Sequence, residues 1–142
     1  TGEKVARIKE GAARLHFDLI ETAAADATVY DAALDGAFDC VICDVPCSGL
    51  GVMAKKPEIR LKDPNDFASL PLLQLAILKN GSKYLKEGGR LLYSTCTLNK
   101  AENEAVTKAF LAENGNFTVL SEETLLPAAD MDGFYYCVMT RR

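Results

Sequence analysis

The chain has 142 residues, 49% of them hydrophobic and 25% charged, and a formal net charge of −4 at pH 7. This suits one globular domain and disfavours binding to nucleic acid except through a local cluster of Lys and Arg. No long apolar stretch or signal-peptide core is present, and the five cysteines are an odd number, so we expect no membrane association, a cytoplasmic location and free thiols.

Helical and extended patterns alternate along the first half of the chain. In residues 4–15, apolar side chains recur at helical spacing between Lys and Arg, which predicts an amphipathic surface helix. Residues 20–23 then predict a short strand that ends near Asp26. Residues 38–45, FDCVICDV, form an apolar run without alternation, which predicts a central parallel strand buried on both faces. Residues 55–66 carry two prolines and no apolar period, so we expect a functional loop.

A second helix and a second buried strand follow. Pro71 suits the first turn of a helix that we expect to end at Gly88 or Gly89. Gly81 weakens that helix by about 1 kcal/mol relative to Ala. Residues 90–96, RLLYSTC, have the composition of another buried strand.

The last third of the chain completes an α/β pattern. Asn99 and Glu102 have the spacing of a capping box for a helix that runs to about Glu113. Two closing strands are predicted at residues 117–120 and 135–140. Strands that alternate with helices predict an α/β fold with helices on both faces of the sheet, in which ligands gather at the carboxyl ends of parallel strands.

Chemically versatile side chains fall at those carboxyl ends. Asp26, Asp44, Cys47 and Cys96 each lie at or just past the end of a predicted strand. On local context alone, small residues that shape tight turns explain the two cysteines equally well, because a reactive thiol also needs a lowered pKa.

Three other patterns do not predict a site. Residues 49–54, GLGVMA, fit a dinucleotide fingerprint, but the polar residues after them do not open the helix that it requires. Cys40 and Cys43 lie three apart on a strand and point to opposite faces, so we expect no metal site there and interpret these thiols, with Cys137, as buried packing groups. His16 fits a helix cap or a surface residue, which leaves little material for a hydrolase triad or a zinc site.

Three longer stretches resemble a known family. They are DVPCSGLG at residues 44–51, PEIR at 57–60 and LKEGGRLLYSTCTLNKAENE at 85–104. Together they resemble the bacterial rRNA cytosine-5 methyltransferases of the RsmB/Sun/Fmu type, within the wider NOL1/NOP2/Sun family of RNA methyltransferases. The resemblance covers nearly the whole chain. It implies a Rossmann-like class I methyltransferase sheet, S-adenosyl-L-methionine as cofactor, and RNA, 16S rRNA above all, as substrate.

The same resemblance implies roles for the residues at the strand ends. Cys96 is the nucleophile that adds to C6 of cytosine, which makes C5 able to take a methyl group. Cys47 assists release of the product, as the base that removes the C5 proton or beside that base. Asp44 lies against the methyl-donor end of the cofactor and the cytosine edge, and Asp26 contacts the adenine.

The basic loop is the expected RNA contact. Lys55, Lys56 and Arg60, with Lys62, would meet the RNA backbone beside the pocket that receives the unstacked base. A solvated charged loop fits these residues equally well.

One part of the family pattern has no counterpart in the sequence. The family's glycine-rich cofactor loop is not found in residues 1–142. We therefore expect the C-terminal portion of one methyltransferase domain, lacking the first two strands of the sheet and inactive by itself. The strand at residues 20–23 would then be poorly placed, or paired in an unusual way or with a partner chain through an exposed edge. A noncatalytic RNA-binding or assembly module and a tRNA cytosine-5 methyltransferase share these motifs and stay open as alternatives.

Overall fold

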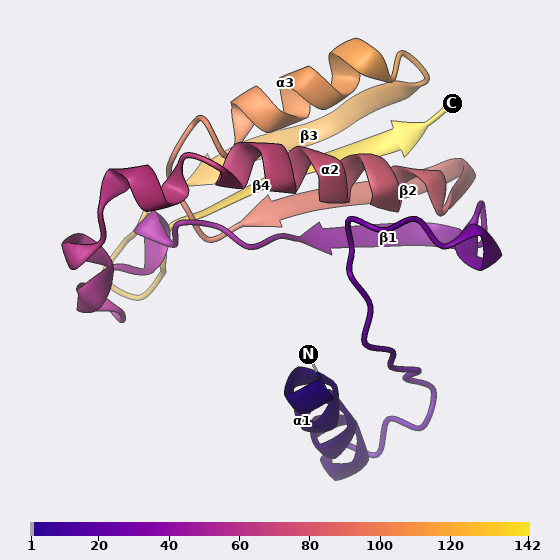
Figure 1. Cartoon of the computed structure of the whole chain (residues 1–142), viewed down its shortest axis with the longest axis horizontal. Helices are drawn as coiled ribbons and strands as arrows, with labels where there is room; N and C mark the ends of the chain where they lie inside the picture. The colour runs from indigo at the N-terminus through magenta and orange to yellow at the C-terminus, as the bar shows by residue number, and fades with distance from the viewer. Residues whose placement is uncertain (1) are drawn as a thin grey trace.

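A four-stranded sheet forms the body of the protein in the computed structural model, which describes residues 2–142 (Figure 1). The strands are β1 (Phe38–Asp44), β2 (Leu85–Thr95), β3 (Phe117–Leu125) and β4 (Phe134–Arg141). Their order in the sheet is β1-β2-β4-β3, with β1 parallel to β2 and the other two pairs antiparallel. The expected α/β fold is confirmed.

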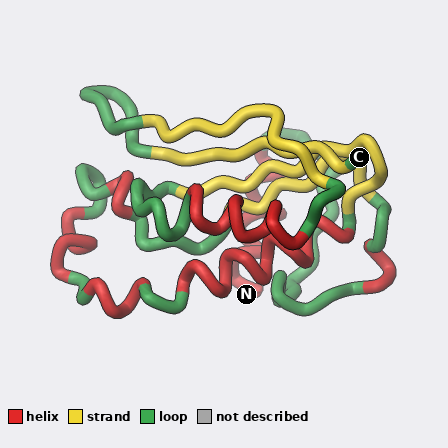
Figure 2. Tube along the Cα trace, turned by 90° about the horizontal axis from the view of Figure 1, so that it is seen from above, coloured by secondary structure: helices red, strands yellow, loops and turns green. Residues whose placement is uncertain are grey.

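Two helices pack on one face of this sheet. These are α2 (Leu70–Lys83) and α3 (Glu104–Glu113), and both lie on the same side of the strands (Figure 2). The sequence predicted helices on both faces, whereas in the described residues the packed helices cover this face alone. Strand β4 shows the consequence, because Tyr135, Cys137 and Met139 are buried while the side chains between them are half-exposed. Alternate side chains of a strand point to opposite faces, so the buried set faces the helices.

The hydrophobic core lies between the helices and the sheet. Its aromatic side chains meet edge to face, with ring centroids 6.1 Å apart for Tyr93 and Tyr135 and 5.1 Å apart for Phe110 and Phe117. Burial of each large apolar side chain stabilises the fold by about 1.5–3 kcal/mol. The buried core residues are Cys43, Val45, Leu78, Leu85, Leu91, Tyr93, Val106, Phe110, Phe117, Tyr135, Cys137 and Met139.

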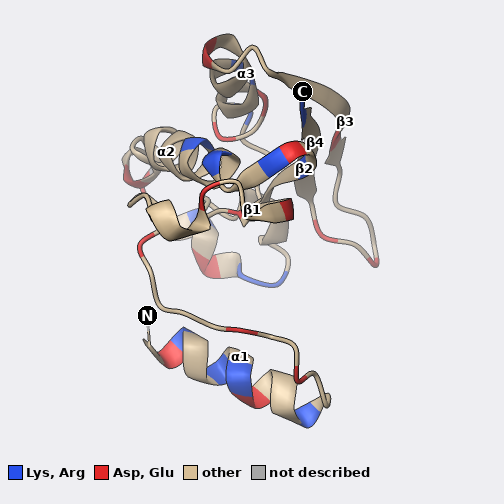
Figure 3. Cartoon of the chain, turned by 90° about the vertical axis from the view of Figure 1, so that its right-hand side faces the viewer, with Lys and Arg blue, Asp and Glu red and all other residues tan. Residues whose placement is uncertain are grey.

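Helix α1 (Gly2–Arg14) lies apart from this body (Figures 1 and 3). It has no buried residue, and charged side chains of both signs lie along it. Its end is a Schellman turn, in which His16 has a φ of 57° and the N–H of Phe17 donates to the carbonyl of Ala12. His16 is therefore a helix-terminating residue, one of the two readings that the sequence left open.

The strand expected at residues 20–23 is wrong. That segment is extended but belongs to no strand, because no other strand of the described chain lies beside it to complete a ladder. The chain becomes attached to the body a few residues later. There the side-chain amide of Asn80 donates to the carbonyls of Ala27 and Val29, each at 2.9 Å.

Three further expectations need correction. Within residues 2–142, β1 is an edge strand rather than a central one, and Cys43 is its only buried residue. Helix α2 ends at Lys83, before Gly88, because β2 already begins at Leu85 and pairs there with β1. The N-cap position of α3 is taken by Asn103 rather than by Asn99.

The connection expected at residues 55–66 is confirmed as irregular. It consists largely of two short 3₁₀ turns, Pro57–Leu61 and Pro64–Phe67. The carboxylate of Asp63 caps the second turn by accepting from the N–H of Asn65 at 2.9 Å. Among the described residues, no helix has both the length and the apolar character that a membrane crossing needs.

Candidate active site

Two cysteines meet where β1 and β2 end. Cys47 lies in the turn after β1 and Cys96 directly follows β2, and their Sγ atoms are 3.2 Å apart. Parallel neighbours end at the same edge of a sheet, which explains how residues 49 positions apart come together. The N–H of Val45 donates to the carbonyl of Ser94 at 3.2 Å and extends the pairing beyond β1. The expected convergence of the two thiols is what the structure shows.

The pKa of the Cys47 thiol is raised to about 12. Burial is the largest cause, and the hydrogen bond and charge interaction with Cys96 come next. Backbone N–H groups of Gly49 and Cys96 oppose the shift without cancelling it. Cys47 is therefore protonated at neutral pH, and its S–H can donate to the sulfur of Cys96.

Asp44 precedes Cys47 by three residues at the carboxyl end of β1. It is the last residue of β1, is exposed, and accepts a hydrogen bond from Ser94 Oγ at 3.1 Å on Oδ1. One side of its carboxyl group is thereby held by β2, while the other is free to meet a ligand at the strand ends.

A buried carboxylate joins the two turns that carry the cysteines. Glu102 is fully buried, and its Oε2 accepts from the N–H of Ser48 at 2.9 Å and from Gln74 Nε2 at 3.0 Å. Its Oε1 accepts from Asn99 Nδ2 at 2.9 Å. Gln74 Nε2 also donates to the carbonyl of Pro46 at 2.9 Å. The sequence predicted only a capping role for Glu102 with the nearby Asn99, because Ser48 and Gln74 come from distant segments.

Further hydrogen bonds link the same turns. The hydroxyls of Ser48 and Thr97 lie 2.7 Å apart, and Asn103 Nδ2 donates to the carbonyl of Thr97 at 2.9 Å. These side chains are all buried. Hydrogen-bonded side chains in a buried network rigidify the segments that carry them, although Gln74 Oε1 has no partner among the described residues.

A close backbone contact completes this architecture. The N–H of Gly51 donates to the carbonyl of Cys96 at 3.0 Å, and its carbonyl accepts from the N–H of Gly133 at 2.8 Å. A Cβ on Gly51 would lie 2.2 Å from the carbonyl oxygen of Gly133. Only glycine therefore fits at this position, which gives the glycines of GLGVMA a packing explanation.

Asp26 lies outside the cysteine site, on the exposed segment that follows α1. Its Oδ1 accepts from the hydroxyl of Thr28 at 2.7 Å and from the N–H of Thr28 at 2.9 Å, and these bonds lower the pKa of Asp26. The next residue, Ala27, lines a cavity of about 240 Å³ together with Asp44. Asp44 therefore lines this cavity itself, whereas Asp26 is connected to it only through its chain neighbour Ala27.

The basic residues of the loop divide into two groups. Lys55 forms an ion pair with Asp132 at 2.6 Å, and Lys56 is exposed. Arg60 and Lys62 line a separate pocket beyond the cysteine turns.

The remaining cysteines follow the sequence analysis only in part. Cys43 and Cys137 are buried, as expected, but Cys40 is exposed because it lies on the edge strand β1. Within the described part of the chain, His, Cys, Asp and Glu form no group of three or more suited to a metal ion.

The sequence and the fold are similar to those of known proteins. Residues 1–140 match the family described as 16S rRNA methyltransferase RsmB/F. The chain is 36% identical over 159 residues to a probable ribosomal RNA small subunit methyltransferase B of Bacillus subtilis, covering 98% of this chain and 36% of that protein. It is 41% identical over 92 residues to a tRNA (cytosine(34)-C(5))-methyltransferase of Drosophila melanogaster, covering 63% of this chain and 12% of that protein. This chain therefore spans about a third or less of these relatives.

A solved structure shares the architecture. It is a methyltransferase homologue from Pyrococcus horikoshii, which matches all of this chain and 51% of its own length with a TM-score of 0.80 at 22% identity. The high structural similarity at this low identity shows that the two proteins share a fold. The methyltransferase sheet expected from the sequence is confirmed.

Proposed function

This chain belongs to the 16S rRNA methyltransferase RsmB/F family, and we propose that its protein methylates C5 of a cytosine in RNA, with 16S rRNA as the leading substrate. The observation that carries the proposal is the approach of Cys47 Sγ to Cys96 Sγ at 3.2 Å, at the same end of the sheet where β1 ends with the exposed Asp44. Two thiols and an acid at the carboxyl ends of parallel strands supply the groups that a covalent cytosine methylation needs.

Cys96 acts as the nucleophile. Its thiolate adds to C6 of the unstacked cytosine, and the electron pair of the C5–C6 double bond then becomes available at C5. When Cys96 is a thiolate, only the S–H of Cys47 can donate in this contact, and it then stabilises the negative sulfur before the addition. S-adenosyl-L-methionine, when bound, supplies an electrophilic methyl group for C5.

Cys47 acts in release. After methylation, the proton on C5 must leave so that the C5–C6 double bond re-forms and the Cys96–C6 bond breaks, which regenerates the thiolate. While Cys96 is bound to C6 as a thioether, it no longer contributes the interactions that raise the pKa of Cys47. Once the Cys47 thiol has lost its own proton to solvent, it can accept the proton from C5, or it acts beside another base that does.

Asp44 fits the recognition of the cytosine edge. With one oxygen held by Ser94, its carboxyl group is positioned to hold N3 or the exocyclic amine. That contact would favour addition at C6 by stabilising the charge that develops in the ring.

The residues beside β1 fit the adenosine part of the cofactor. The cavity of about 240 Å³ has apolar walls from Val41 and Ile42, with Asp44 at one side and Ala27 at another. Apolar side chains beside a carboxylate suit a purine ring and the hydroxyl and amine groups around it. Asp26 and Asp44 would hold the cofactor there.

A covalent adduct tests the proposal. The full-length gene product is incubated with S-adenosyl-L-methionine and RNA that carries 5-fluorocytosine, from which C5 cannot lose its substituent. We expect an adduct that survives denaturing electrophoresis and disappears in Cys96→Ala. Cys40→Ala removes an exposed thiol and should leave the adduct intact.

Release provides a second readout. With ordinary cytosine RNA, Cys47→Ala should accumulate the adduct that the native protein resolves. Absence of any adduct in the native protein would instead favour a noncatalytic RNA-binding or assembly module. Parallel reactions with 16S rRNA and tRNA transcripts separate the leading substrate from the tRNA alternative, which the Drosophila relative keeps open.

A further inference from the structure

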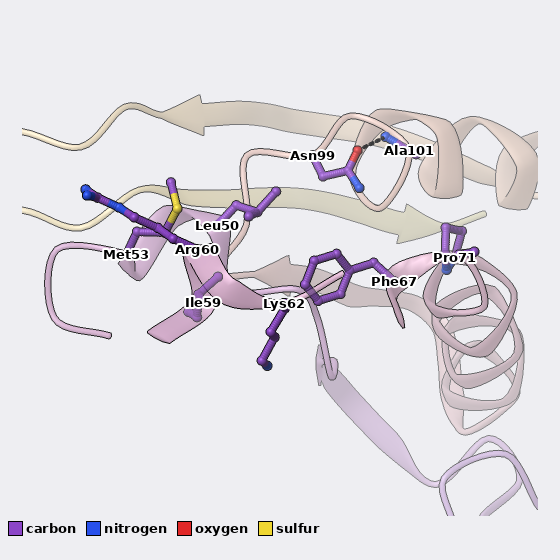
Figure 4. A pocket seen from close by; sticks show the side chains of 10 residues that line it. Leu50, Met53, Ile59, Arg60, Lys62, Phe67, Pro71, Asn99 and Ala101 are labelled. Atoms are coloured by element: carbon purple, nitrogen blue, oxygen red, sulfur yellow. Dashed lines mark hydrogen bonds between the residues drawn. The ribbon is translucent and has the colours of Figure 1, made fainter. Parts of the chain in front are cut away.

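A pocket of about 530 Å³ adjoins the turns that hold the cysteine pair (Figure 4). Its walls are mainly apolar and include Leu50, Ile59 and the ring of Phe67. The volume lies within the range of about 300–1,000 Å³ that is typical of small-molecule sites.

The position of this pocket ties it to the reaction site. Leu50 follows Cys47 by three residues, and Asn99 follows Cys96 by three residues. A span of three residues reaches at most about 11 Å. A nucleotide next to one whose base lies at the cysteines is therefore within reach of the pocket.

The charges at the pocket match a polyanion. Arg60 and Lys62 both line it, and the described lining residues include no Asp or Glu. Lys62 Nζ lies 5.9 Å from the centroid of the Phe67 ring. An aromatic face combined with cations is the arrangement that single-stranded nucleic acids use, with bases stacked on rings and phosphates near the charges.

We propose that this pocket binds the nucleotide that flanks the target cytosine in the RNA strand. The base of that nucleotide stacks on Phe67, and its phosphate pairs with Arg60 or Lys62. The proposal rests on the proposed RNA methylation and adds a specific subsite to it.

Binding of a labelled oligonucleotide tests the subsite. The probe is a fluorescein-labelled 11-nucleotide oligouridylate with one central cytidine, and affinity for the full-length gene product is measured by fluorescence anisotropy. Phe67→Ala should weaken binding roughly tenfold, because stacking on one aromatic ring contributes on that order. Phe67→Tyr should restore binding.

Controls separate stacking from folding. Phe38 is 42% exposed at the amino end of β1, the opposite end from Cys47, so Phe38→Ala should leave the affinity unchanged. Arg60→Ala should reduce the slope of log affinity against log salt by about one unit. Circular dichroism and thermal unfolding verify that each variant is folded.

An abasic probe identifies the base that Phe67 contacts. Removing the base on one side of the cytidine should weaken native binding as much as Phe67→Ala does, and the variant should lose nothing further with that probe. If Phe67→Ala weakens binding of the intact probe and of both abasic probes by the same factor, Phe67 does not stack on either flanking base, and the subsite is overturned. A native 5-fluorocytosine adduct with no effect of Phe67→Ala would refute the subsite alone. If Phe67→Ala weakens binding but the native protein forms no adduct, the proposed methylation is refuted and the pocket remains an RNA-binding site.

Discussion

Glu102 is an ionisable side chain with no exposure to water. Burying an unpaired carboxylate is strongly unfavourable, so its stability in this position depends on the donors that replace water. Those donors are the N–H of Ser48, the amide of Gln74 and the amide of Asn99. They belong to the turn after β1, to α2 and to the turn after β2. The geometry of the cysteine pair thus depends on one carboxylate that contacts neither sulfur.

Replacing this carboxylate by an amide tests that dependence. In Glu102→Gln, one side of the new amide is a donor and faces another donor, so a buried hydrogen bond is lost. We expect the free energy of unfolding to fall by about 1–3 kcal/mol, measured by urea denaturation. The rate of adduct formation should fall at saturating RNA, with little change in RNA affinity.

Glu87→Gln is the matched control, because Glu87 is an exposed carboxylate of β2. It should behave like the native protein in both measurements. Native stability and native adduct rate in Glu102→Gln would contradict a positioning role for Glu102.

The protonation of Cys47 gives a pH-dependent prediction. Burial first, and the interaction with Cys96 second, raise the pKa of Cys47 from 9.0 to about 12. Alkylation of Cys47 by iodoacetamide should therefore stay slow through pH 9, while exposed Cys40 reacts readily. In Cys96→Ala the second cause is lost, so the pKa of Cys47 should fall and its alkylation at pH 9 should accelerate. Mass spectrometry of the two peptides provides the measurement.

The same shift has a consequence for stability. Because the folded pKa is higher than the unfolded one, the protonated thiol contributes stability that is fully present below pH 9 and is lost as the pH rises toward 12. Equal alkylation of Cys47 and Cys40 at pH 8 would contradict this assignment.

At the level of elements, the approach of α2 to β1 depends on a glycine. A Cβ on Gly81 would lie 2.7 Å from the Sγ of Cys43 and 3.5 Å from Cγ1 of Val41. Glycine therefore allows the helix to pack closely on the strand that ends at Asp44, although it weakens the helix itself by about 1 kcal/mol relative to Ala.

Gly81→Ala should destabilise the protein despite its better helix propensity. Overpacking costs about 1–3 kcal/mol, and the gain in propensity offsets only about 1 kcal/mol of it. Cys43→Ala removes the sulfur that the new methyl group meets, so the double variant should recover stability in a double-mutant cycle. Gly11→Ala in α1 is the control, because nothing lies within 4 Å of its added Cβ, and it should raise the helicity measured by circular dichroism.

Elements with strong local patterns were predictable from the sequence. The helix expected at residues 4–15 is observed as Gly2–Arg14, and the helix expected from Pro71 begins at Leu70. The strand at residues 20–23 failed because a strand needs a neighbour, which hydrophobic pattern alone does not supply. The cap at Asn103 was missed because the capping-box spacing of Asn99 gave a competing local signal.

The candidate site was predictable only in part. Cys47 and Cys96 were expected to meet because parallel strands end at one edge of a sheet. The positioning role of Glu102 was missed, because two of its three donors, Ser48 and Gln74, are distant in sequence. The pocket at Phe67 was missed for the same reason, since its walls come from four separate segments of the chain.

At the level of the whole molecule, contacts of Asn80 and Tyr84 attach the segment after α1 to the body formed by the sheet and its helices. We call these contacts the clasp. Asn80 is nearly buried in α2 and donates to the carbonyls of Ala27 and Val29, and the hydroxyl of Tyr84 accepts from the N–H of Asp31. The rings of Tyr30 and Tyr84 stack with centroids 5.9 Å apart. This clasp determines where Asp26 lies relative to the cavity beside β1.

Loss of the clasp should therefore separate cofactor binding from the cysteine chemistry. Asn80→Ala removes the donor to the carbonyl of Ala27 and leaves that of Val29 only the 3.5 Å bond from the Tyr84 hydroxyl, which should release the segment and raise the rate of chymotryptic cleavage at Tyr30. Calorimetric titration of the full-length gene product should show weaker binding of S-adenosyl-L-methionine, because Asp26 is no longer held near the cavity. The pH profile of Cys47 alkylation should stay native, since that site is held by Glu102, which contacts α2 through Gln74 rather than through Asn80. Asn65→Ala, in the exposed loop, is the control. Unchanged cofactor affinity together with faster cleavage would show that Asp26 does not contribute to cofactor binding.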